Sequence, residues 1–168
     1  MPEGIINRVT NSKLLTIDLE DYYVEGKRFL LDISKWLDEG LVLREKKFRE
    51  TVGSNDWVVF KDGLVALHCS TDAIVPVWAY MLVSSKLSGI AAKTTLGTLE
   101  DLERELFIDQ ISRLNLSDYK DKNVIIKGCS KKPVPDFAYV LMTQKLELIS
   151  KAVLYGEACS SVPIFKKK

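Results

Sequence analysis

The chemistry that this sequence could support centres on its three cysteines, which share one local pattern. Cys69, Cys129 and Cys159 are each followed directly by a serine and, a few residues later, by a Val-Pro pair. Soft thiolate sulfurs suit zinc, copper or an iron–sulfur centre. Cysteines that only fill a core have no reason to share these neighbours. The pattern therefore predicts one metal site built from all three thiols.

The serines beside the cysteines are predicted to support that site. Their hydroxyl or backbone N–H groups can hydrogen-bond sulfur, as a metal thiolate requires. The cofactor-binding residues predicted in this way are Ser70, Ser130 and Ser160.

A tetrahedral site needs a fourth ligand besides the three sulfurs. His68, the only histidine, immediately precedes Cys69 and is the first candidate. Neighbouring residues of a strand point to opposite faces, so both can bind only if the strand ends at His68. Asp72, Glu157, a water molecule or a ligand from a partner are the alternatives, and an ordinary half-buried histidine is the other interpretation of His68.

Two other interpretations of the cysteines stay open. They are buried, inert residues at strand ends, or one of them is a reactive thiol. A cysteine nucleophile needs a base within reach, and the adjacent histidine is poorly placed for that role. The spacing differs from the paired C-x-x-C of zinc ribbons, and H-E-x-x-H, G-x-S-x-G and Gly-rich phosphate motifs are all missing. We therefore assign no catalytic residue.

Composition limits the class of protein. The 168 residues carry a net charge of +1 and are 46% hydrophobic, which is typical of a globular domain and gives no long-range attraction to nucleic acid. We find no export signal at the start and no apolar run near the roughly 20 residues that a membrane helix needs. We expect a cytoplasmic protein that binds neither nucleic acid nor membrane, in which free thiols or metal ligands are more plausible than disulfides.

The cysteine loops belong to a longer internal repeat, and this repeat predicts the fold. Residues 75–97 match residues 134–156 at an offset of 59, with nine identities. Each copy has a short apolar run, a cysteine loop, a proline suited to a first helical turn, a helix and a second apolar run. We predict an α/β fold with a mostly parallel sheet, helices on its faces and two duplicated βαβ units at about 64–97 and 124–156. The aromatic residues of the two helices, Tyr80 and Tyr139 among them, are assigned to the core.

The remaining segments are predicted to extend this one domain, which covers residues 1–168. Thr98 and Asp101 form the capping pattern of a helix that separates the two copies. Residues 1–63 contain two strand-like runs, at 14–19 and 29–33, and a charged helix at 44–52, and they read as an N-terminal extension of the same domain. Loops at the carboxyl ends of parallel strands gather at one sheet edge, so we expect the three thiols to meet there.

The chain resembles a bacterial family known only as a domain of unknown function, family 2480, through nearly its full length. The resemblance rests on Asn7-Arg8-Val9 near the start, on His68-Cys69-Ser70 with Pro76-Val77-Trp78-Ala79-Tyr80, and on Lys127-Gly128-Cys129-Ser130 and Tyr155-Gly156-Glu157. The family brings no established activity. What the resemblance implies is an accessory role in handling iron, sulfur or clusters.

These observations favour a metal-binding or iron–sulfur-binding accessory protein that uses the three-cysteine site. Zinc or an iron–sulfur cluster is the predicted cofactor, and iron–sulfur assembly proteins are the predicted partners. The alternatives are a non-catalytic interaction protein with buried cysteines and an enzyme that carries a thiol or persulfide. Whether the protein is an enzyme, and its oligomeric state, stay open.

Overall fold

The computed structural model describes residues 14–128 and 130–168. They form a mixed α/β fold with mostly parallel strands, as predicted, and the strands are divided between two sheets. The chain splits into two compact units. Unit 1 contains the described residues up to Tyr23 and from Phe107 onward, and unit 2 contains Val24–Leu106.

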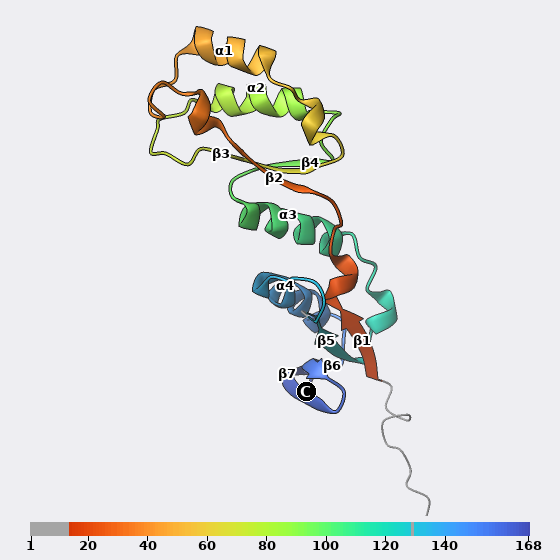
Figure 1. Ribbon diagram of the computed structural model, residues 1–168. Coiled ribbons are helices and arrows are strands. Elements are labelled where there is room, and N and C mark those ends of the chain that lie inside the picture. Colours follow the sequence, from red (N-terminus) through yellow and green to blue (C-terminus); the bar gives the residue numbers. More distant parts are fainter. Residues whose placement is uncertain (1–13, 129) are drawn as a thin grey trace, which may run out of the picture. The chain divides into compact units, whose positions relative to one another are not determined.

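Unit 2 is built on a three-stranded parallel sheet in the order β2-β3-β4 (Figure 1). The strands are β2 (Arg28–Asp32), β3 (Leu64–His68) and β4 (Lys93–Leu96). Helices α1 (Glu45–Ser54) and α2 (Val77–Leu87) pack on one face through Phe48, Val83 and Leu87, while the start of α3 (Leu99–Ser112) packs on Leu64 and Ala66 of the other. Because β3 is covered on both faces, four of its five residues are buried.

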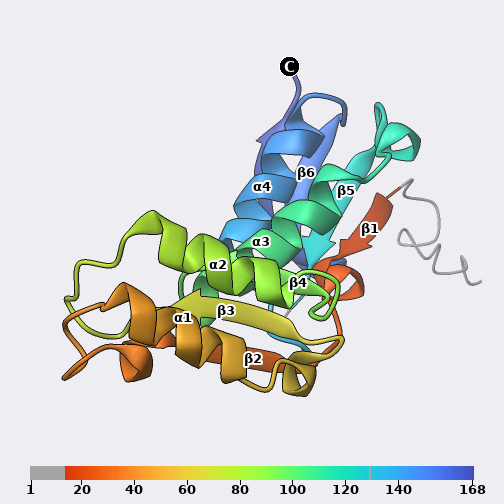
Figure 2. The same ribbon diagram turned by 90° about the horizontal axis from the view of Figure 1, so that it is seen from above.

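Unit 1 has a four-stranded sheet in the order β1-β5-β6-β7. The parallel strands are β1 (Leu14–Asp18), β5 (Asn123–Lys127) and β6 (Ala152–Glu157), and β7 (Ser160–Lys166) adds antiparallel to β6 through a tight turn. Helix α4 (Asp136–Glu147) covers this sheet, as Figure 2 shows, and buries Ala138, Met142 and Leu146. The end of α3 contributes Phe107 and Ile111 to the same core.

The two units share a plan, which is visible in the positions of their elements. The first residues of β3, α2 and β4 are each 59 positions before those of β5, α4 and β6. Asp62 and Asp121 both have φ of 56°, and Gly97 and Gly156 both have positive φ, so the turns before and after each crossover are alike as well. The proposed origin in a duplication stays a prediction, but the two β-α-β crossovers are comparable position by position.

Residues 14–63 contribute one strand to each of the two sheets. Strands β1 and β2 pair along their full lengths with β5 and β3, respectively. Each ends in an aspartate whose side chain accepts the N–H two residues later and starts a short 3-10 helix, η1 (Leu19–Tyr22) or η2 (Ile33–Trp36). The remaining short helices are η3 (Val58–Phe60) and η4 (Ser117–Tyr119).

Candidate functional site

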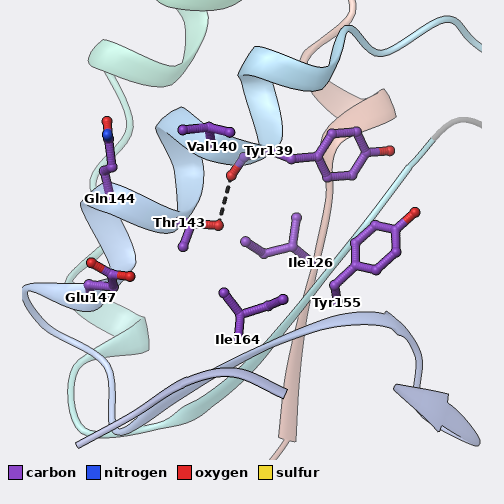
Figure 3. A pocket seen from close by; sticks show the side chains of 8 residues that line it. All are labelled: Ile126, Tyr139, Val140, Thr143, Gln144, Glu147, Tyr155 and Ile164. Atoms are coloured by element: carbon purple, nitrogen blue, oxygen red, sulfur yellow. Dashed lines mark hydrogen bonds between the residues drawn. The ribbon is translucent and has the colours of Figure 1, made fainter. Parts of the chain in front are cut away.

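The candidate site is a pocket of about 460 Å³ between helix α4 and strands β5, β6 and β7 of unit 1 (Figure 3). We call it the α4–β6 pocket. Its volume lies in the range of small-molecule sites in proteins. The residues that line it are Ile126, Tyr139, Val140, Thr143, Gln144, Glu147, Tyr155 and Ile164.

The floor of the pocket is apolar. Ile126 rises from β5, and Ile164 reaches it from β7, with α4 along the opposite side (Figure 3). A β-bulge brings Ile164 there, because Val153 and Leu154 of β6 pair with Phe165 and Pro163 and leave Ile164 between them. Bulges of this kind turn a side chain away from the regular alternation of a strand.

Two tyrosines form one end of the pocket. The rings of Tyr139 and Tyr155 meet edge to face, with centroids 5.6 Å apart and planes at 78°. Tyr139 also packs against the core of unit 1, whereas Tyr155 is 48% exposed. Together they present aromatic surface with two hydroxyl groups, a surface suited to an apolar or cationic ligand group.

Gly128 makes room for the inner tyrosine. A β-carbon on Gly128 would lie 2.8 Å from the Tyr139 hydroxyl and 3.3 Å from side-chain atoms of Leu19 and Val134. Real β-carbons do not approach other atoms as closely as 2.8 Å, so any larger residue would displace the phenol. The position of the Tyr139 ring in the pocket therefore depends on a glycine at position 128.

Polar groups from α4 lie at the other end. Glu147 and Gln144 point from the helix on the side away from the tyrosines (Figure 3). The Thr143 hydroxyl donates to the Tyr139 carbonyl at 2.8 Å, so its proton is already used within the helix. A carboxylate only accepts hydrogen bonds, so Glu147 favours a ligand that carries a positive charge or a donor group.

Unit 2 has a groove at the equivalent place, which we call the α2–β4 groove. Seven of its lining residues are each 59 positions before a residue of the α4–β6 pocket: Leu67, Tyr80, Met81, Ser84, Ser85, Ser88 and Leu96. Of these seven pairs only Tyr80 and Tyr139 are identical. The two replacements that change the chemistry most are Leu96 for Tyr155 and Ser88 for Glu147. Among the described residues, β4 also ends its sheet, whereas β6 is joined by β7.

The sequence predicted a metal site at the carboxyl ends of the parallel strands. In the structure, the loops at these ends donate hydrogen bonds to two carboxylates of the protein, Asp32 and Glu20. Asp32 accepts the Ser70 hydroxyl at 2.6 Å and the backbone N–H groups of Ser70 and Ser34 at 3.1 and 3.0 Å. Partial desolvation opposes ionisation, but these hydrogen bonds outweigh it and hold the pKa of Asp32 well below its usual range.

Glu20 performs the same role in unit 1. It accepts the backbone N–H of Lys131 at 3.0 Å and both the hydroxyl and the N–H of Ser130. The Lys131 N–H is the main cause of a lowered pKa of Glu20. Ser70 and Ser130, predicted to support a metal thiolate, thus hydrogen-bond carboxylates, and Ser160 is the first residue of β7.

The predicted cysteine site does not form in the described part of the chain. No group of three or more His, Cys, Asp or Glu side chains within 14–128 and 130–168 could hold a metal ion. Cys69 belongs to unit 2, where its thiol contacts the Thr71 carbonyl at 3.7 Å, and Cys159 lies exposed in the β6–β7 turn of unit 1. Cys129 lies outside the described residues.

The prediction of a metal-binding or iron–sulfur-binding accessory protein is therefore wrong. The thiols are separated by the arrangement of the sheets, because Cys69 follows a strand of one sheet and Cys159 follows a strand of the other. His68 does end β3, as joint binding with Cys69 required, and it pairs with Asp32 in the ladder. Zinc or a cluster as cofactor, and iron–sulfur assembly proteins as partners, stay predictions that nothing in the described residues supports.

The tyrosine pocket was missed because Tyr139 was assigned to the core alone. A signal was present in the repeat, since Tyr80 and Tyr139 match while Leu96 and Tyr155, or Ser88 and Glu147, differ. Such differences between similar copies indicate where one copy has a separate role. Among the described helices, none is long and apolar enough to cross a membrane.

The comparisons with known proteins identify a family whose function is unknown. Residues 3–167, nearly the whole chain, match the family described as "Protein of unknown function (DUF2480)". No curated protein and no solved structure matches the chain.

Proposed function

We propose, for a chain that belongs to this family of unknown function, that it binds a small organic amine in the α4–β6 pocket. The observation that supports this most is the combination of a tyrosine pair at one end of an apolar floor with a carboxylate at the other. Such a pocket selects a ligand with an apolar or aromatic body and a positively charged head.

The expected pose follows from the lining residues. The aromatic body of the ligand lies on Ile126 and Ile164 with its edge against the tyrosine rings. The ammonium group then donates hydrogen bonds to the Glu147 carboxylate, which is the only charged group among the lining residues. Because the pocket is open to solvent at Val140 and Tyr155, which are 57% and 48% exposed, we expect modest affinity for a small fragment.

Three matched probes test the charge requirement. Phenethylamine, 2-phenylethanol and phenylacetate share one ring and chain and differ in the charge of the head group. Calorimetric titration should give the tightest binding for phenethylamine, with phenylacetate at least about tenfold weaker, because a like charge faces Glu147. Equal affinity for all three probes, or binding of none, would contradict the proposal.

A matched pair of variants assigns the binding to this pocket. Glu147→Gln keeps the shape and removes the charge, so it should abolish the preference for the amine while the neutral alcohol binds as before. Ser88→Ala, at the equivalent position of unit 2, should leave the affinities for the amine and for the alcohol unchanged. A preference that survives Glu147→Gln would place the amine elsewhere.

A further inference from the structure

The free edge of β4 and the exposed face of α2 form one continuous surface in unit 2. β4 is the last strand of its sheet among the described residues. The apolar side chains beside it are unusually open: Val77 is 72% exposed, Met81 65% and Leu96 61%. Exposed edge strands next to apolar surface are sites where another strand adds to a sheet.

Unit 1 shows what covers the equivalent surface. There β7 pairs antiparallel with β6 and places Ile164 in the pocket beside α4. An occupant of the α2–β4 groove must therefore supply an antiparallel strand and a surface that covers Leu96 and Met81.

A second copy of this chain meets both requirements, and we propose that the protein forms a two-fold dimer through β4 and α2. Lys93 and Gly97 direct their N–H groups to Gly63 and Leu67 on the β3 side. Backbone groups alternate along a strand, so those of Thr94 and Leu96 face the open edge. In an antiparallel pair, Thr94 lies opposite Leu96 of the second copy, and the two residues exchange hydrogen bonds.

The exposed face of α2 is complementary to itself in the same arrangement. A two-fold axis perpendicular to the sheet keeps both α2 helices on one face and makes them antiparallel. The large residues Val77 and Met81 lie in the first half of the exposed face, and the small residues Ser84, Ser85 and Ser88 lie in the second half. Each large side chain then meets small ones of the second copy, which allows close packing.

The charges of the groove favour the same occupant. No carboxylate or lysine is among the residues that line the α2–β4 groove, so two copies meet without like charges at the centre. The glutamate of the equivalent place in unit 1, Glu147, is Ser88 here. Burial of a hydrophobic centre free of charge is typical of homodimer interfaces.

Sedimentation equilibrium of the full chain over a wide range of concentration tests the proposal. The expected mass is twice the 19.0 kDa of the chain, with dissociation on dilution. Met81→Glu brings two carboxylates into the interface and should weaken the dimer by about tenfold or more. Thr94→Pro removes an outward N–H without breaking the β3–β4 ladder and should weaken it as well.

Val140→Glu is the matched control, because Val140 is the equivalent of Met81 in unit 1. It should leave the dimer unchanged, and circular dichroism should show that all three variants are folded. A chain that stays at 19.0 kDa at every concentration overturns the proposal and leaves the edge to a strand of another protein. A dimer that neither Met81→Glu nor Thr94→Pro weakens also overturns it.

Discussion

The α4–β6 pocket and the α2–β4 groove occupy equivalent places in two units with the same plan, and they differ in what surrounds them. In unit 1 the added strand β7 supplies a wall, and Tyr155 and Glu147 supply aromatic surface and charge. In unit 2 the same positions are Leu96 and Ser88, and the strand edge is open in the described structure. Under the two proposals made above, one crossover plan serves a ligand site in one unit and an interface in the other.

The largest expected effects come from the cores beneath these two places. Leu87 and Leu146 are equivalent and almost completely buried, so replacing either by alanine should cost about 2–4 kcal/mol of unfolding free energy. All three tryptophans, Trp36, Trp57 and Trp78, lie in unit 2. Leu87→Ala should therefore shift the urea transition seen by tryptophan fluorescence.

Leu146→Ala should act first on unit 1. Its main effect should be faster amide hydrogen exchange in β5, α4 and β6, with a smaller change in the fluorescence transition. Equal loss of protection in both units from either variant would show that they unfold as one body, and the comparison between them would then be geometric only.

Exchanging the residues that distinguish the two places should alter binding next. The variant Tyr155→Leu with Glu147→Ser places the two corresponding residues of the groove in the pocket, and phenethylamine affinity should fall by about tenfold or more. The reciprocal variant, Leu96→Tyr with Ser88→Glu, should gain no comparable binding, because no β7 covers β4. Calorimetric titration measures both, and amine binding gained in unit 2 would contradict the role given to β7.

The smallest effects are expected at Asp32 and Glu20, the two carboxylates that accept hydrogen bonds from the loops of Ser70 and Ser130. Asp32→Asn should cost about 1 kcal/mol at pH 7, since a partly exposed, charge-assisted set of hydrogen bonds is weakened. The lowered pKa of Asp32 means that its contribution is complete above its usual value near 4 and is lost as the pH falls below about 4.

The difference between wild type and Asp32→Asn should accordingly shrink in acid, as urea unfolding at pH 7 and pH 3 would show. Glu20→Gln should have a smaller effect, because the hydrogen bonds that Glu20 accepts are exposed to solvent, whereas the one that Asp32 accepts from Ser34 is partly buried. A larger loss from Glu20→Gln than from Asp32→Asn would reverse this order and require tighter packing around the loop of unit 1.

The sequence predicted most features that depend on neighbouring residues. The Thr98–Asp101 cap is present, with the Thr98 N–H donating to Asp101 at 2.8 Å, and helices α2 and α4 lie within the predicted ranges. These elements follow from apolar periodicity and capping, which are local. β7 was not predicted, because Ser160, Ser161 and Pro163 resemble a loop, although an edge strand tolerates proline.

The prediction of the cysteine site was wrong because it depended on the pairing of distant strands, which no local sequence pattern indicates. Residues after parallel strands meet at one edge only if their strands share a sheet. β3, before Cys69, and β6, before Cys159, lie in different sheets. The pairing of strands that are distant in sequence decides this, and the repeat alone could not indicate it. The same repeat does contain a signal of the pocket, because Tyr155 and Glu147 differ from their equivalents Leu96 and Ser88.

The most direct test of the account is an amide-resolved NMR titration of the full chain with phenethylamine. The account predicts that the shifted resonances belong to α4, β6 and β7, around Thr143, Glu147, Tyr155 and Ile164, and that those of α2 and β4 do not move. Shifts concentrated in α2 and β4, or no saturable shifts in either unit, would contradict it.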